Sequence, residues 1–192
     1  MNDQDDDQRH MRFDSLAREA VPLLARYLRR RTDPETADDV LGDTLVVMWR
    51  RFDDVEDLPQ GSRLPWCYGV ARGCLANARR ANDRRRGLVR RLAAQPVQRS
   101  PSGPHNDTEQ HDDELYAALE TLSDTDREVL RLWAWEQLEP REIGVALGIS
   151  ANAASIRLHR ATERLRGRLG VTRKTHPRAG HVVPRQESET SP

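Results

Sequence analysis

The chain has 192 residues, of which 36% are hydrophobic and 32% charged, so it can form one or two small domains with small helical cores. Its 31 basic and 31 acidic residues give a net charge of zero, and whole-chain charge therefore indicates no nucleic-acid partner. No run of about 18 apolar residues occurs, and the N-terminus MNDQDDDQRH is too acidic for a secretory signal. We expect a cytoplasmic protein that is not inserted in a membrane.

Three helices are predicted in the N-terminal part of the chain. The first covers about 14–31, with Pro22 expected to kink or split it. Asp33 and Pro34 are typical of the cap and first turn of a second helix, which reaches about residue 52. A third helix is expected to begin near Pro65.

Charge is polarised within these helices. Residues 33–57 contain nine acids and two arginines, a net charge of −7. Residues 63–91 contain nine arginines and one acid, a net charge of +8. One face could therefore meet a basic protein surface and another could meet phosphates, although ion pairs between the two helices are an alternative explanation.

Residues 139–169, EPREIGVALGISANAASIRLHRATERLRGRL, predict two helices joined by a tight turn. Pro140 suits a first helical position, Gly148 suits a helix end, and the Ser150 hydroxyl can cap the next helix. Residues 157–168 carry a net charge of +4, which favours a DNA-binding helix-turn-helix over a hairpin whose arginines are only solvated. The apolar stripe of the second helix consists of Ala151, Ala154, Leu158, Ala161 and Leu165.

The fold expected from these patterns is all-α, with two small helical domains joined by a flexible linker. The linker is rich in Pro, Ser, Gly, Gln and Asp and has almost no apolar residues. The predicted order is a disordered acidic stretch at 1–11, a helical domain at 12–92, the linker at 93–113, a second helical domain at 114–170 and a disordered tail at 171–192.

Three segments together resemble the extracytoplasmic-function (ECF) sigma factors of bacterial RNA polymerase. They are ADDVLGDTLVVMWRRF, PWCYGVARGCLANARR and LETLSDTDREVLRLWAWEQLEPREIGVALGISANAASIRLHRATERLR, and the resemblance extends over residues 12–169. It implies a sigma region 2 domain and a sigma region 4 domain. The implied function is promoter-specific transcription initiation through binding of core RNA polymerase and of the −10 and −35 promoter elements.

For region 2, the resemblance implies contacts with the β′ clamp helices of core polymerase and melting of the −10 element. Melting needs aromatic groups for unstacked bases and cations for the backbone. Gly42 and Gly73 depart from residues common in the family, Gln and Asn respectively. The candidate polymerase contacts are Asp39, Val40, Asp43 and Thr44, and the candidate −10 contacts are Arg63, Trp66, Tyr68, Arg72, Gly73, Arg79 and Arg80.

For region 4, the resemblance implies recognition of the −35 element and contact with the β flap. Arg160 is the candidate for bidentate contact with a guanine, and Ile156 for contact with a thymine methyl. Arg157 is expected to meet phosphate. The full candidate set on the second helix is Asn152, Ala153, Ser155, Ile156, Arg157, His159, Arg160 and Arg164. The family commonly has an anti-sigma factor as a further partner.

Other function classes have less support. A helix-turn-helix repressor or activator that binds DNA alone would explain only the C-terminal part. No GxxxxGK[ST], GxSxG or HExxH motif indicates an enzyme. Cys67 and Cys74, seven residues apart in a helix, are expected to be buried thiols and not a disulfide. The histidines and cysteines lack metal-ligand spacing, so neither a metal nor a cofactor is predicted.

Overall fold

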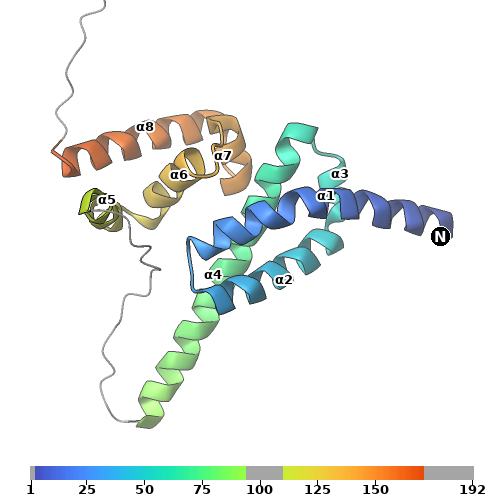
Figure 1. Cartoon of the computed structure of the whole chain (residues 1–192), viewed down its shortest axis with the longest axis horizontal. Coiled ribbons are helices and arrows are strands. Elements are labelled where there is room, and N and C mark those ends of the chain that lie inside the picture. Colours follow the sequence, from blue (N-terminus) through green and yellow to red (C-terminus); the bar gives the residue numbers. More distant parts are fainter. Residues whose placement is uncertain (1–2, 94–109, 171–192) are drawn as a thin grey trace, which may run out of the picture.

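The computed structural model describes residues 3–93 and 110–170, and these two stretches contain eight helices and no strand (Figure 1). This confirms the all-α prediction. The N-terminal half consists of α1 (Asp3–Arg29), α2 (Pro34–Arg50), α3 (Phe52–Glu56) and α4 (Gln60–Ala93). The C-terminal half consists of α5 (Gln110–Glu120), α6 (Asp124–Ala134), α7 (Pro140–Leu147) and α8 (Ala151–Arg168).

Side-chain caps fix where several helices begin. The Asp33 carboxylate accepts a hydrogen bond from the Thr36 amide at 2.9 Å, and Pro34 occupies the first turn of α2. The Ser123 hydroxyl likewise accepts from the Asp126 amide at 3.2 Å at the start of α6. The Asp33 cap is the one that the sequence predicts.

The N-terminus differs from the prediction, because helix α1 already begins at Asp3. The expected disorder at 1–11 is therefore wrong for residues 3–11. Arg9 explains part of the difference, since it donates hydrogen bonds to the Asp53 carboxylate and the Trp49 carbonyl, both at 3.0 Å. Its guanidinium also lies 4.1 Å from the centre of the Trp49 ring. Pro22 does not split α1, because apolar packing continues on both sides of it.

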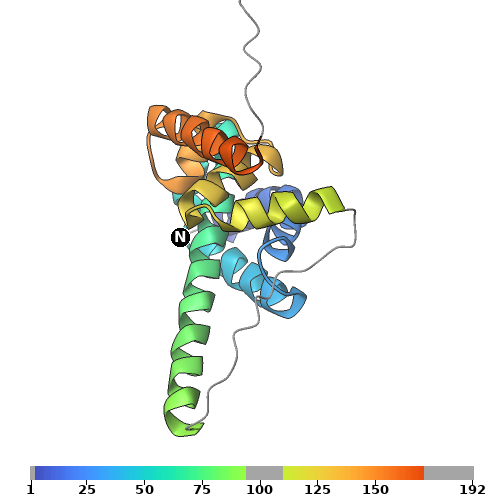
Figure 2. The same ribbon diagram turned by 90° about the vertical axis from the view of Figure 1, so that its left-hand side faces the viewer.

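Helix α4 is longer than the sequence predicts. It begins at Gln60, so Pro65 lies inside it, and it continues for 34 residues to Ala93. Its end projects away from the other helices, as the view in Figure 2 also shows. The predicted linker at 93–113 is shortened by α4 and by α5, and its central part, 94–109, lies outside the described residues. The tail at 171–192 lies outside them as well.

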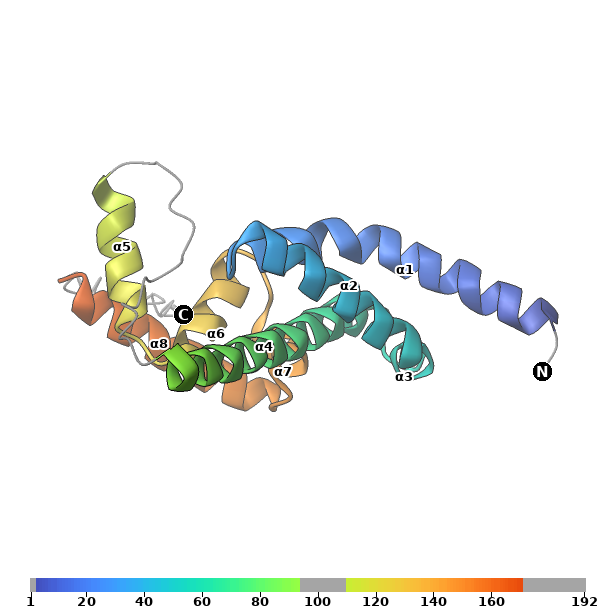
Figure 3. The same cartoon turned by 90° about the horizontal axis from the view of Figure 1, so that it is seen from below.

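Helix α4 packs against α1 and α2 of its own half and against α7 of the C-terminal half, so it lies at the boundary between the two halves (Figures 1 and 3). The largest apolar cluster crosses this boundary. It joins buried residues of α1, α2 and α4, such as Leu24 and Tyr68, to buried residues of the C-terminal half, such as Ile143 and Ala146. The two halves therefore share one core in this structure. None of the described helices is long and apolar enough to cross a membrane.

Candidate nucleic-acid interface

The helix-turn-helix is built by local capping and one close backbone contact. Glu139 and Glu142 form a capping box at the start of α7, with the Glu142 carboxylate accepting from the Glu139 amide at 2.8 Å. Gly148 ends α7 in the left-handed region, with φ of 67°. The Ser150 hydroxyl then accepts from the Ala153 amide at 3.1 Å and begins α8. These features confirm the predicted turn.

Gly144 decides how closely the two helices approach. A Cβ atom at this position would lie 2.8 Å from the Ile149 carbonyl oxygen and 3.3 Å from the Ala151 amide nitrogen. Both are backbone atoms, which cannot rotate away as a side-chain end can. The spacing between α7 and α8 therefore requires a residue without a side chain here.

Helix α8 has one buried and one exposed face. Ala154 and Ala161 are fully buried, and Leu158 and Leu165 pack partly buried against the hydrophobic clusters. The face opposite this stripe is exposed and includes Ile156, an apolar side chain that is 44% exposed. The predicted contact residues Asn152, Ala153, Ser155, Ile156, His159, Arg160 and Arg164 are all exposed, and Arg157 is half-buried. This face is polar and basic.

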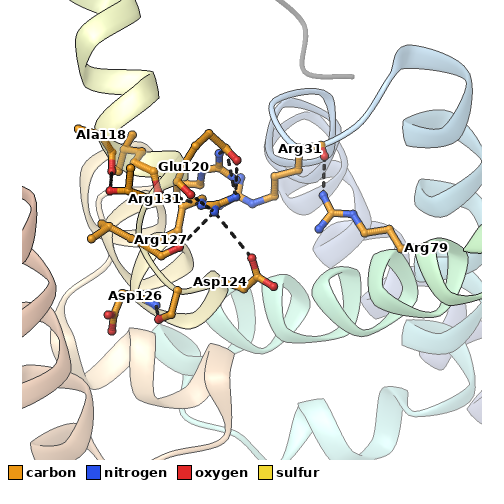
Figure 4. A network of polar contacts seen from close by, with 12 residues as sticks. Arg31, Arg79, Ala118, Glu120, Asp124, Asp126, Arg127 and Arg131 are labelled. Atoms are coloured by element: carbon orange, nitrogen blue, oxygen red, sulfur yellow. Dashed lines mark hydrogen bonds and ion pairs between the residues drawn. The ribbon is translucent and has the colours of Figure 1, made fainter. Parts of the chain in front are cut away.

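Arg164 has a structural contact in addition to its predicted role. Its guanidinium is hydrogen-bonded to the carboxylate of Asp126, which is buried at the start of α6. Arg127 of α6 links this helix to α5. It donates to the Leu119 carbonyl at 3.1 Å and to the Glu120 carboxylate at 3.0 Å (Figure 4). Polar contacts of these two arginines therefore join α8 to α6 and α6 to α5, in addition to the apolar contacts between the helices.

The predicted −10 residues of α4 do not form one surface. Arg72, Gly73, Arg79 and Arg80 are exposed, whereas Tyr68 is only 2% exposed. The Tyr68 ring lies 5.2 Å from that of Tyr27, within the shared core. The prediction that Tyr68 contacts bases therefore fails for this arrangement of the helices.

Three other predicted −10 residues have intramolecular partners. Arg63 donates to the Glu56 carbonyl at 3.1 Å and holds the end of α3. Trp66 is half-buried, with the Arg51 guanidinium 5.5 Å from its ring centre. Arg79 donates to the Arg31 carbonyl at 2.6 Å, as Figure 4 shows. Arg79 nevertheless remains exposed to solvent.

The predicted polymerase-binding residues of α2 divide between its two faces. Asp39 and Asp43 are exposed, but Val40 is 1% exposed and Thr44 is fully buried, with its hydroxyl donating to the Val40 carbonyl. Direct docking by Val40 and Thr44 is therefore wrong, because they share the buried stripe of the helix. Val46 is not among the predicted contacts. It is 48% exposed, and its spacing of seven residues from Asp39 could have indicated the same face.

Sequence reasoning also missed a buried ionic group between the two halves. The Arg31 guanidinium donates to Glu128 and to Glu136 of the C-terminal half, both at 3.1 Å. The Tyr27 hydroxyl donates to the second oxygen of Glu128 at 2.8 Å. Burial is the largest single effect and would lower the pKa of Arg31, but Glu128, Tyr27 and Glu136 together outweigh it and raise that pKa. Arg31 is therefore charged in this buried position.

Burial also raises the pKa of a thiol and a phenol in the core. It raises the pKa of the Cys67 thiol to about 12, and that of Tyr68 to about 12, the latter with a smaller contribution from Glu136. Cys67 and Cys74 are both free thiols. Within residues 3–93 and 110–170, no group of three or more His, Cys, Asp or Glu side chains could hold a metal ion.

The known proteins whose sequences resemble this chain are sigma factors of RNA polymerase. The family described as sigma-70, region 4, matches residues 112–165. The RNA polymerase sigma-E factor of Streptomyces coelicolor is 34% identical over 183 residues, which cover 93% of this chain and 96% of that protein. The ECF RNA polymerase sigma factor SigL of Mycobacterium tuberculosis is 30% identical over 170 residues, which cover 81% of this chain and 89% of the relative.

Solved structures show the same fold. The sigma factor RpoE of Bartonella quintana, in complex with the anti-sigma factor NepR, superposes with a TM-score of 0.56 at 22% identity over 84% of this chain and 98% of that one. CnrH, in complex with the cytosolic domain of CnrY, gives a TM-score of 0.55 at 24% identity over 82% of this chain and 87% of that one.

Proposed function

Because the chain belongs to the ECF sigma factors, which direct promoter-specific transcription initiation by RNA polymerase, we propose how its parts divide that work. Residues 12–92 act as region 2, which docks on core polymerase and opens the −10 element, and residues 114–170 act as region 4, which reads the −35 element. The observation that carries this division is the exposed polar and basic face of α8, held by a capped turn on a buried stripe.

We propose that region 4 places the first three turns of α8 in the major groove. Arg160 is exposed there and can present two N–H groups to a guanine, while the exposed Ile156 can meet a thymine methyl. Arg157 lies half-buried at the edge of this face, where it can reach a phosphate. Arg164 would contact phosphate with the hydrogen-bonding groups that remain beside its Asp126 contact.

For region 2, we propose that the exposed arginines of α4 bind the backbone of the −10 region. Arg72 and Arg80 lie on the exposed surface of the helix, which continues past them toward its projecting end. Trp66, half-buried, offers an aromatic edge to an unstacked base.

For core polymerase, we propose that one exposed face of α2 contacts the β′ clamp helices. Asp39, Asp43 and Val46 share this face and combine two carboxylates with an exposed apolar group. The aromatic side chain of Trp133 on α6, which is 50% exposed, is the candidate contact for the β flap. The protein would thus work in the cytoplasm, where core polymerase is found.

An anti-sigma factor is the proposed regulator. Two proteins of similar structure were each solved with a bound protein: the sigma factor RpoE with the anti-sigma factor NepR, and CnrH with the cytosolic domain of CnrY. A protein of that kind would compete with core polymerase for the same exposed faces.

The test is transcription in vitro from a matching promoter, with core polymerase and with or without this chain. We expect initiation only when both are present. A gel shift at physiological salt adds a second measurement, because a monomer with one recognition helix and zero net charge should bind its promoter tightly only with core polymerase. Tight and specific binding by the free chain would instead favour a repressor or activator.

A further inference from the structure

We propose that Arg31, Glu128 and Glu136 form a latch that holds the two halves of the free chain closed, and that this latch must open before the chain engages a promoter. The latch itself is inferred from contacts within the chain. Its inhibitory role rests on the proposed function, because it concerns what the closed form prevents.

The latch joins residues that are about 100 positions apart in the sequence. The Arg31 side chain is 2% exposed and that of Glu136 is fully buried, with 3.1 Å between their ion-paired atoms. The Glu128 carboxylate lies 3.1 Å from the same guanidinium. An ion pair this deeply buried is lost at great cost if one partner is removed, because the remaining charge has no partner. The closed arrangement therefore depends on the latch.

Close backbone packing accompanies the latch. A Cβ atom at Gly69 of α4 would lie 2.9 Å from the Ala146 carbonyl oxygen of α7. The two helices thus touch at their backbones across the boundary between the halves. Tyr68, the neighbour of Gly69, is covered in the same shared core. The one tyrosine that the sequence predicts to contact bases is therefore buried in the closed form.

The closed form is too short to span a promoter. Elements centred near −10 and −35 lie about 25 base pairs apart, or roughly 85 Å of duplex. Five peptide steps, at most about 18 Å, separate Ala146 from the start of α8, so that start lies within roughly 25 Å of Gly69. Arg80 lies about 16 Å further along α4, so even Arg80 and the start of α8 are at most about 40 Å apart. One closed chain therefore cannot occupy both elements.

The covalent chain permits opening. The 17 residue steps from Ala93 to Gln110 could extend by at most about 60 Å. The boundary between the halves is also imperfectly paired. The buried atoms Arg31 Nη2 and Arg131 Nε make no hydrogen bond to any other described group, and Arg30 Nη1 and Glu136 Oε2 form only a 3.5 Å ion pair with each other. Such atoms would gain hydrogen bonds with water when the two halves separate. These features suit a contact that is broken during function.

Small-angle X-ray scattering of the free, full-length chain tests the latch. We expect wild type to be compact and the variant E128R/E136R to have a radius of gyration larger by roughly 5 Å or more. Reversing both charges against Arg31 should shift the closed-to-open equilibrium by a factor of about 10² or more. The control E35R/E114R reverses two exposed glutamates, one in each half, and should stay compact. Expanded wild type, or compact E128R/E136R, would overturn the latch.

A second variant covers the case in which E128R/E136R loses its helical circular dichroism. Gly69→Leu adds a side chain directly against the Ala146 carbonyl without changing any charge, and leucine favours a helix. The matched control is Gly87→Leu on the same helix, where a Cβ atom would meet nothing within 4 Å. We expect expansion only for Gly69→Leu. Scattering by Gly69→Leu that equals that of Gly87→Leu would overturn the closed arrangement.

Assembly of the chain with core polymerase on a promoter tests the inhibitory role separately. If only the open form can occupy both elements, an opened variant should form the promoter complex about tenfold or more tightly than wild type, because the closed fraction no longer reduces the apparent affinity. Equal affinity for wild type and a variant that scattering shows to be open would overturn inhibition. Failure of the proposed function would look different, because the chain would then support no transcription while its scattering still changed as expected.

Discussion

Gly144 sets the geometry of the recognition helix, and replacing it with alanine gives a sharp test of the turn. The new Cβ atom would lie 2.8 Å from the Ile149 carbonyl oxygen, a separation that real Cβ atoms essentially never show. The neighbouring atoms belong to the backbone between α7 and α8. The contact can be relieved only if the two helices move apart.

Two opposing effects set the magnitude. Alanine is favoured over glycine inside a helix by about 1 kcal/mol. Inserting a methyl group into a packed contact costs about 1–3 kcal/mol. Because backbone atoms receive the clash at Gly144, the second effect should exceed the first. We therefore expect Gly144→Ala to lower the free energy of unfolding by roughly 1 kcal/mol.

Gly42→Ala is the matched control. Gly42 also lies inside a helix, but a Cβ atom there would meet nothing within 4 Å. Only the helix preference remains, so this variant should be more stable than wild type by about 1 kcal/mol. Urea unfolding followed by circular dichroism measures both. Equal stabilisation by the two substitutions would refute the close approach of α7 and α8.

Four further outcomes are expected. Ser150→Ala should cost about 1 kcal/mol in urea unfolding because the α8 amide loses its cap; no change would contradict that cap. Arg160→Ala should lose about 1–3 kcal/mol of discrimination at one base pair, measured by transcription from promoter variants; equal loss on all variants would rule out base reading. Asp39→Arg with Asp43→Arg should weaken pull-down of core polymerase at moderate salt and leave helical dichroism unchanged, so wild-type affinity would exclude docking by α2. The pKa of Cys67 is raised from 9.0 to about 12, so the stability it contributes is complete below pH 9 and is lost as pH rises toward 12; alkylation of native Cys67 at pH 8 should be about 10³-fold slower than in the unfolded chain.

The sequence could predict features whose partners lie within a few residues of one another. The Ser150 cap reaches an amide three residues ahead, and Gly148 needs only its own positive φ to end α7. Pro140 likewise acts within one turn. The apolar stripe of α8 follows from the helix period, and it correctly predicts that Ala154 and Ala161 are buried. Local chemistry therefore determined the helix-turn-helix.

Two predicted polymerase contacts lie on the buried face of their helix. Val40 and Thr44 sit beside Asp39 and Asp43 in the sequence, but the helix turns by about 100° per residue and places them on the buried side. The family pattern grouped all four by adjacency. Helix periodicity separates the two pairs, because residues one position apart point to different sides of the helix.

Other features were decided only by the tertiary structure. Arg31 pairs with carboxylates 97 and 105 positions later in the chain, and no local pattern marks those partners. Gly69 meets a carbonyl of a helix from the other half, and Tyr68 is buried against Tyr27 in the core that the two halves share. Helix period and caps act over three or four residues, whereas buried ion pairs and backbone contacts depend on which surfaces fold together. That choice belongs to the packing of whole helices, and it decides which predicted DNA contacts are accessible.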